Sequence, residues 1–164
     1  MSGTPVELYV SLKLPPVTVR DALMRVMRAI AQGAIHYRKV RLSAPLEILG
    51  GGSVSVPIEA QIENRPGRWE CAIHIEAAQT GKFFPTFDGT IAVTPDGADA
   101  SELWLQGTYA PPGGILGKGL DSTVMRGVAE KSLNEFLESI AESVRQEVER
   151  TERERAQQAL RYHG

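Results

Sequence analysis

The sequence predicts an α+β domain that consists of a first strand and helix, an antiparallel meander and one long C-terminal helix. Two observations predict this class. Apolar and polar residues alternate in several short runs that are separated by turn residues, and a long amphipathic stretch follows these runs. Consecutive strands joined by short turns pair antiparallel, because parallel neighbours need a crossover connection.

The N-terminal segment Val6–Leu14 alternates apolar and polar residues, which predicts a strand with one buried face. Pro15–Pro16 ends this strand, since proline cannot donate a hydrogen bond to a sheet. Apolar residues then recur at helical spacing over Val19–Gln32, with Thr18 as the expected N-cap. A second strand is expected over Ile35–Leu42.

Four further alternating runs predict the meander, and the turns between them each contain glycine. The runs are Val54–Ile62, Trp69–Ile75, Phe83–Val93 and Leu103–Tyr109. Each run has a polar parity beside its apolar one, so we expect one face of the sheet to meet water.

The C-terminal part combines a loop with a long helix. Prolines and glycines between Ala110 and Gly119 predict the loop, and a continuous apolar stripe over Leu120–Val148 predicts the helix. Opposite charges four residues apart favour helix beyond this stripe, towards Leu160. These pairs are Arg145–Glu149, Glu149–Arg153 and Arg150–Glu154. We therefore expect one domain over residues 1–148, followed by a charged helical extension or a frayed tail over 149–164.

Composition and charge exclude several classes of protein. The chain has 164 residues and 17.9 kDa, which suffices to bury a core without disulfides or a structural metal. Its formal net charge of −2 gives no general attraction to nucleic acid, so we expect no nucleic-acid partner. The single cysteine, Cys71, excludes an intramolecular disulfide framework and fits a reducing compartment. The start of the chain lacks a secretory leader pattern and no apolar run could span a bilayer, so we expect a cytoplasmic protein and no integral membrane segment.

Three segments carry a pattern of strand, G-x-Y-x-P-P-x-G loop and helix with spaced apolar residues. They are FFPTFDGTIAV (Phe83–Val93), LWLQGTYAPPGGILGKGLD (Leu103–Asp121) and RGVAEKSLNEFLESIAESV (Arg126–Val144). The pattern resembles bacterial members of the START-related SRPBCC superfamily, of polyketide cyclase and lipid-transport type. The likeness covers the C-terminal half well and the N-terminal half in element order. It implies the helix-grip fold, in which a curved antiparallel β-sheet wraps around a long C-terminal α-helix.

The resemblance also implies a cavity between sheet and helix that holds an apolar molecule such as a lipid, a sterol or a polyketide. The positions expected to face this cavity are Phe87, Leu105, Tyr109, Phe136 and Ile140. The loop expected to act as a lid contains Pro112, Gly113, Gly114 and Gly117. Ordinary core packing explains the first five positions as well, although Tyr109 could present its hydroxyl at the mouth of the cavity. No cofactor is expected.

The sequence does not identify catalytic residues. His36, His74 and His163 form no HExxH motif, and Cys71 alone cannot make a thiolate zinc site, so no metal is expected. His74 and Asp88 occupy the polar parity of their runs. We therefore expect both on the outer face of the sheet, away from the cavity.

Residues 20–41 contain six basic side chains and one acidic side chain, that of Asp21. The cations are Arg20, Arg25, Arg28, Arg38, Lys39 and Arg41. We expect a solvated face there, with weak binding to an acidic partner or a membrane surface as the alternative. Three functions stay open. The first is a non-enzymatic carrier or sensor of a hydrophobic small molecule, and the second is a cyclase, aromatase or dehydratase that uses Tyr109 and one His or Asp for proton transfer. The third is an interaction module that works through the C-terminal helix and the basic zone, and a homodimer through that helix is the expected assembly.

Overall fold

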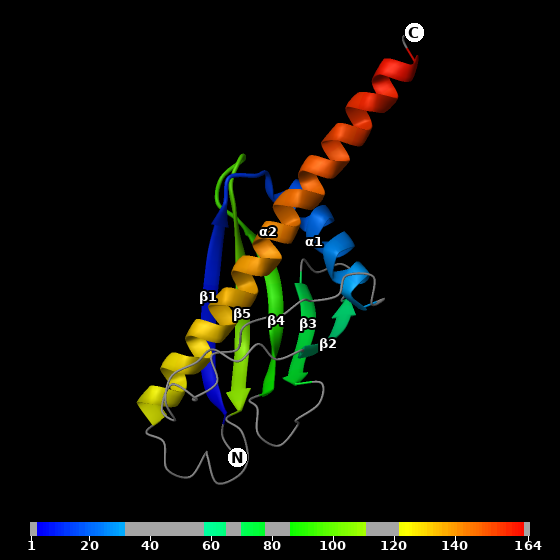
Figure 1. The fold of residues 1–164 in the computed structure, drawn as a ribbon. Coiled ribbons are helices and arrows are strands. Elements are labelled where there is room, and N and C mark those ends of the chain that lie inside the picture. Colours follow the sequence, from blue (N-terminus) through cyan, green and yellow to red (C-terminus); the bar gives the residue numbers. More distant parts are fainter. Residues whose placement is uncertain (1–2, 32–57, 65–69, 78–85, 111–121, 163–164) are drawn as a thin grey trace, which may run out of the picture.

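One antiparallel sheet and two helices that pack on it make up the described part of the chain. The computed structural model describes residues 3–31, 58–64, 70–77, 86–110 and 122–162. The elements are β1 (Thr4–Leu12), α1 (Pro16–Ala31), β2 (Ile58–Asn64), β3 (Glu70–Ala77), β4 (Thr86–Pro95), β5 (Ser101–Ala110) and α2 (Ser122–Tyr162) (Figure 1). The predicted α+β class is confirmed. The strand predicted over Ile35–Leu42 lies outside the described residues.

The described strands form one antiparallel sheet of five strands in the order β1-β5-β4-β3-β2. The strands β2 to β5 follow one another across the sheet, which confirms the meander. The first strand of the chain pairs with the last one, from Thr4 opposite Tyr109 to Leu12 opposite Ser101. The N-terminal strand therefore forms one edge of the sheet.

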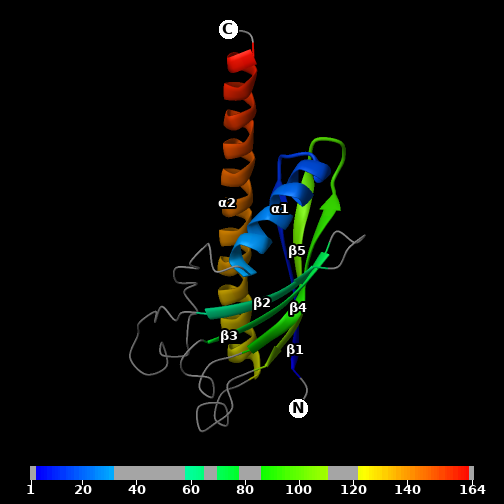
Figure 2. The same ribbon diagram turned by 90° about the vertical axis from the view of Figure 1, so that its right-hand side faces the viewer.

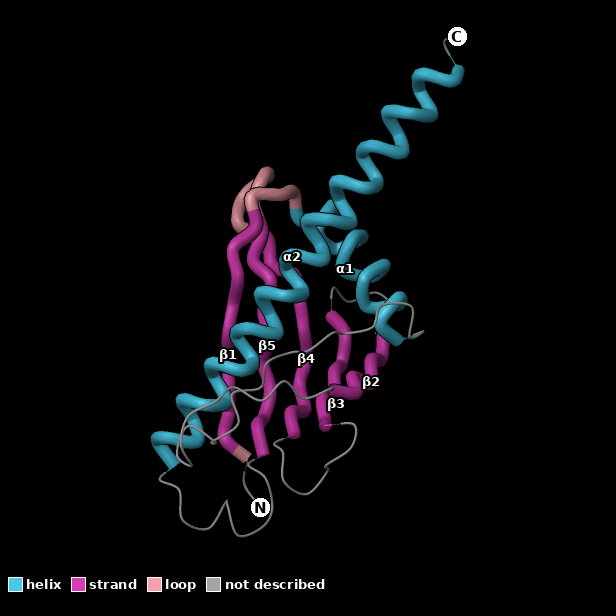
Figure 3. The backbone as a smooth tube through the Cα atoms, viewed as in Figure 1, coloured by secondary structure: helices cyan, strands magenta, loops and turns pink. Residues whose placement is uncertain are grey.

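Both helices pack on the same face of this sheet, which we call the inner face (Figures 1 and 2). Helix α2 contacts β1 and β5, α1 contacts β2 and β4, and the two helices contact each other. Buried apolar side chains from both helices and from β1, β3, β4 and β5 form one core cluster between these layers. The twisted sheet and the long helix that crosses it are the helix-grip arrangement that the sequence predicted (Figure 3).

The start of α1 differs from the prediction. The helix begins at Pro16 rather than after Thr18, and the backbone N–H of Val19 donates to the carbonyl of Pro15 at 3.0 Å. Proline suits the first position of a helix, because its missing N–H would have no partner there and its φ is already helical. Pro16 thus starts α1, whereas β1 ends at Leu12 and not at the predicted Leu14, ahead of both prolines.

Helix α2 is continuous over 41 residues, about 60 Å at 1.5 Å per residue. Its buried stripe ends at Val148, and beyond that point the described side chains are exposed except for the half-buried Thr151. Two of the predicted ion pairs are confirmed, Arg150–Glu154 and Arg153–Glu149. Arg145 pairs with Glu142 instead of Glu149. None of the helices in the described ranges is long and apolar enough to cross a membrane.

Candidate functional site

Three of the predicted cavity residues lie on the inner face of neighbouring strands. Phe87 of β4 stands directly opposite Tyr109 of β5, and Leu105 of β5 stands opposite Ile91 of β4. All of these side chains are buried in the core cluster. Their shared orientation follows from the alternation of the strands, in which every second residue points to the same face.

A pair of glycines lies beside Phe87 and shapes this part of the inner face. Gly89 and Gly107 are directly opposite each other in the β4–β5 ladder. A Cβ atom built on Gly89 would lie 2.5 Å from Cζ of Phe87, and one built on Gly107 would lie 2.7 Å from the same atom. The ring of Phe87 therefore occupies the space that two side chains would otherwise fill. Both glycines sit on the apolar parity of their runs, but the alternation alone does not show that they are paired.

The hydroxyl of Tyr109 is the notable polar group of the inner face. The residue is only 3% exposed, and among the described residues its hydroxyl has no hydrogen-bond partner. Desolvation by burial raises the pKa of Tyr109 to about 12. The phenol is therefore protonated at neutral pH and can act as a hydrogen-bond donor.

The other polar side chain of the described core is satisfied. Ser101 is fully buried, and its hydroxyl donates to the backbone carbonyl of Leu14 at 2.8 Å. Buried polar groups are nearly always hydrogen-bonded, so a buried hydroxyl without a partner calls for an explanation. The hydroxyl of Tyr109 is thus available to donate a hydrogen bond to a ligand, whereas the hydroxyl of Ser101 already donates to Leu14.

The other two predicted cavity residues lie on helix α2. Phe136 and Ile140 lie one turn apart on the stripe that faces the core, and both are buried in the same cluster as Phe87 and Tyr109. The structure thus places all five predicted cavity residues between the sheet and the helices. The predicted lid residues Pro112, Gly113, Gly114 and Gly117 lie outside the described residues.

The polar candidates occupy the opposite face. His74 of β3 stands directly opposite Asp88 of β4, and Nδ1 of the histidine contacts Oδ1 of the aspartate. The two flanking residues of His74 in β3, Ile73 and Ile75, are buried, so the His74–Asp88 pair lies on the outer face and away from Tyr109. His36 and His163 lie outside the described residues.

Cys71 behaves as a core residue. Its side chain is buried, and Sγ lies 4.0 Å from Sδ of Met24 on α1. Burial, and to a smaller extent the charge of Glu70, raises the pKa of the Cys71 thiol to about 11. The thiol is therefore protonated at neutral pH and a poor nucleophile. Within the described ranges, no three histidine, cysteine, aspartate or glutamate side chains gather as a metal site.

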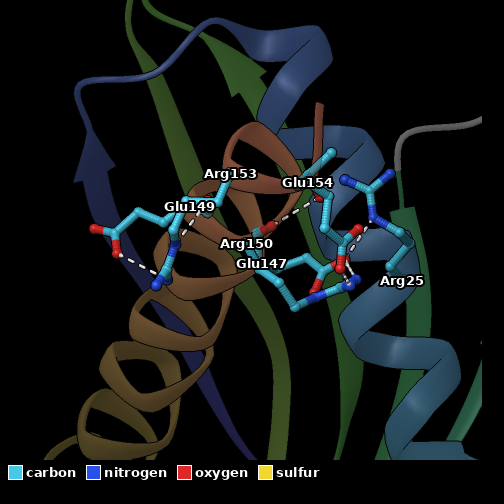
Figure 4. A network of polar contacts seen from close by, with 7 residues as sticks. Arg25, Glu147, Glu149, Arg150, Arg153 and Glu154 are labelled. Atoms are coloured by element: carbon cyan, nitrogen blue, oxygen red, sulfur yellow. Dashed lines mark hydrogen bonds and ion pairs between the residues drawn. The ribbon is translucent and has the colours of Figure 1, made fainter. Parts of the chain in front are cut away.

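The groove between the helices is bridged by ion pairs. Arg25 of α1 contacts Glu147 of α2, which also pairs with Arg150, and Arg150 reaches Glu154 (Figure 4). Shallow hollows of about 240 and 470 Å³ lie on the surface at this bridge, and Arg25 lines both. Two of the described arginines in the predicted basic zone thus contact acids, because Arg20 also pairs with Asp21 at 2.9 Å.

Comparison with known proteins reveals a likeness in structure. No family model matches the chain, and no curated protein matches its sequence. A conserved protein from Geobacillus kaustophilus superposes with a TM-score of 0.54 at 16% identity, covering 87% of this chain and 96% of that one. A START superfamily protein from Mycobacterium smegmatis gives a TM-score of 0.52 at 14% identity, covering 91% and 99%.

A third structure is larger than this chain. The di-domain ARO/CYC protein BexL from the BE-7585A biosynthetic pathway gives a TM-score of 0.50 at 18% identity, and the match covers 87% of this chain and 46% of BexL. Identities this low establish the architecture and not the activity. The sheet order, the two helices on one face and these superpositions together show that the chain has the helix-grip fold of the START-related SRPBCC proteins.

Proposed function

We propose that this protein binds a hydrophobic small molecule, of the lipid, sterol or polyketide class, between the inner face of the sheet and α2. The observation that carries the proposal is the buried hydroxyl of Tyr109, which has no partner among the described residues although apolar side chains surround it. Binding sites for small molecules are mostly apolar and contain a few polar groups that orient the ligand. The inner face has this composition.

The protein acts in this proposal as a carrier or sensor rather than as an enzyme. General acid–base catalysis needs a titratable group within hydrogen-bond reach of the reacting atoms. The one described histidine, His74, lies with Asp88 on the outer face, and the phenol of Tyr109 is too weak an acid to serve as a base at neutral pH. Among the described residues the inner face therefore offers a hydrogen-bond donor and no base.

A binding experiment tests the proposal. Native mass spectrometry of the purified protein should show a retained apolar ligand, and fluorescent fatty acids, sterols or aromatic polyketide mimics should bind saturably. Methyl NMR locates the site: signals of Leu105 and Ile140 should shift on titration. Leu160, 76% exposed on the far part of α2, is the internal control and should stay unchanged. Absence of saturable binding across all three ligand classes would refute the carrier.

The alternative is an enzyme of polyketide cyclase, aromatase or dehydratase type. The likeness to BexL and the protonated phenol of Tyr109 favour it, since a donor can polarise a ketone during cyclisation. Incubation with a poly-β-keto thioester mimic separates the two functions. A carrier returns the mimic unchanged, whereas an enzyme releases a cyclised product at a rate that falls with Tyr109→Phe.

Two further features belong to the proposal. We place a homodimer on the exposed end of α2, where Leu160 and Tyr162 are 76% and 88% exposed. Sedimentation of the full chain should then show a dimer that the double variant Leu160→Ser, Tyr162→Ser converts to monomer, and a monomer at all concentrations would refute it.

We place the protein in the cytoplasm, where its single cysteine would stay reduced, and fractionation of cells tests that location.

A further inference from the structure

We infer that the ligand presents an uncharged oxygen acceptor, such as a ketone, an ester or an ether, to the hydroxyl of Tyr109. This inference rests on the proposed function and adds the chemical class of the ligand. Its basis is a buried hydroxyl without a described partner, in a core whose other buried hydroxyl, that of Ser101, is hydrogen-bonded.

The need for an acceptor follows from the hydroxyl itself. Its hydrogen has no acceptor among the described residues, and the residue is almost completely withdrawn from water. A buried donor without a partner lowers stability unless a partner arrives. A ligand oxygen in hydrogen-bond reach of the Tyr109 hydroxyl would remove that penalty, so ligands with such an oxygen gain affinity over ligands of the same shape without it.

The acceptor should carry no charge. Among the described residues, the buried core contains no ionised side chain, and Ser101 is its one buried residue of the polar class. An ionised carboxylate placed there would lose its hydration without gaining a counter-charge, which costs more than one hydrogen bond returns. A ketone or an ester loses little hydration and accepts the same bond.

Phe87 belongs to the apolar surroundings of Tyr109. It is the direct cross-strand neighbour of Tyr109, and its ring lies against Gly89 and Gly107. A ligand oxygen that accepts from the Tyr109 hydroxyl would therefore lie within the apolar core cluster to which both residues belong. The expected ligand has an apolar body and a single weakly polar oxygen at this position.

The test uses two sets of ligands that differ at one group. The first set is 2-acetylnaphthalene, 2-isopropenylnaphthalene and 2-naphthoate, and the second is methyl laurate, 2-ethyl-1-tridecene and laurate. Calorimetry with the full chain should give the ketone and the ester roughly five- to tenfold tighter binding than their hydrocarbon partners, because one net hydrogen bond is worth about this factor. The carboxylates should bind weakest. Tyr109→Phe should abolish the preference for the ketone and ester and leave hydrocarbon affinity unchanged.

A stability measurement without ligand gives an independent readout. Tyr109→Phe removes a hydroxyl that has no described partner, so its urea midpoint should equal or exceed that of the original chain. Ser101→Ala is the matched control: its hydroxyl is hydrogen-bonded to the carbonyl of Leu14, so its removal should lower the midpoint. If Tyr109→Phe lowers the midpoint as Ser101→Ala does, the hydroxyl has an internal partner and the inference is overturned.

The outcomes separate the two proposals. If none of the six ligands binds, the proposed function fails and the inference falls with it. If hydrocarbons bind as tightly as the ketone and the ester, or if a carboxylate binds tightest, the function stands and the inference is overturned. Equal losses for all ligands in Tyr109→Phe would likewise overturn it, because they would indicate a change in shape rather than a lost hydrogen bond.

Discussion

Arg25 of α1 donates through Nε to Oε1 of Glu147 on α2 at 2.7 Å, across 122 residues of chain. Arg150 donates two further hydrogen bonds to the same carboxylate. Its Nη2 lies 2.8 Å from Oε1 of Glu147, and its Nε lies 3.1 Å from Oε2. The side chain of Glu147 is only 15% exposed. This carboxylate therefore joins the two helices at the point where the buried stripe of α2 ends.

Arg25→Gln should lower the free energy of unfolding by about 0.5–1 kcal/mol, because the variant removes an ion pair that is partly exposed to solvent. Urea denaturation at low salt measures the loss, and high salt should reduce it by screening the original pair. Arg28→Gln is the matched control, because Arg28 is exposed on the same helix and has no ion pair within the described ranges. Equal effects of the two variants would contradict a role for the bridge.

Glu147 should make stability depend on pH in the acid range. Hydrogen bonds from Arg150, and next from Arg25, hold the pKa of Glu147 below its ordinary value of 4.5 although burial opposes them. A lowered pKa contributes stability above the unfolded value, and this contribution is lost as the pH falls through the folded value.

Glu147→Gln should therefore be less stable than the original chain at pH 7, and the difference should shrink as the pH falls below about 4.5. Urea midpoints from pH 7 to pH 3 measure it. Glu138→Gln, at an exposed position of the same helix, is the control and should cost less stability at pH 7 than Glu147→Gln. A Glu147→Gln difference that does not change with pH would show that shape, not charge, sets its effect.

Alternation predicted which side chains are buried. Val6, Phe87, Leu105 and Tyr109 face the core as the parity of their runs indicates, because the face of a residue depends on its own strand alone. The neighbours of these side chains depend on register, which is a property of two strands. The opposition of Gly89 and Gly107 could therefore not be derived from either run by itself.

The same reason explains other features that the sequence left open. His74 and Asp88 were each expected on the outer face, but their contact depends on the register between β3 and β4. The place of β1 beside β5 depends on which edge of the meander is open to it. The partner of Arg25 lies on the last helix, and only the packing of α1 on α2 brings them together.

The part of α2 beyond Val148 should be helical without contributing to the cooperative fold. Arg153→Pro removes the backbone hydrogen bond to Glu149 and breaks the helix there. Far-UV circular dichroism should show a loss of helix, while the free energy of unfolding, from urea denaturation at a concentration where the chain is monomeric, should change by less than about 0.5 kcal/mol, because the described side chains of this part are mostly exposed. Arg153→Ala is the control and should keep both signals. A large fall in the midpoint would place the extension inside the cooperative domain.

Gly89→Ala should destabilise the protein by about 1–3 kcal/mol, because the inner face is already filled at this position. The new Cβ would lie 2.2 Å from the backbone oxygen of Gln106 and 2.5 Å from Cζ of Phe87, so the ring would have to leave the glycine pair and the ladder would have to shift. Gly127→Ala gives the opposite sign. That glycine lies exposed in α2 with no atom within 4 Å of an added Cβ, so the better helix propensity of alanine should add about 0.5–1 kcal/mol. Urea denaturation of both variants measures the contrast, and a Gly89→Ala protein as stable as the original would show that Phe87 does not need the space above the glycines.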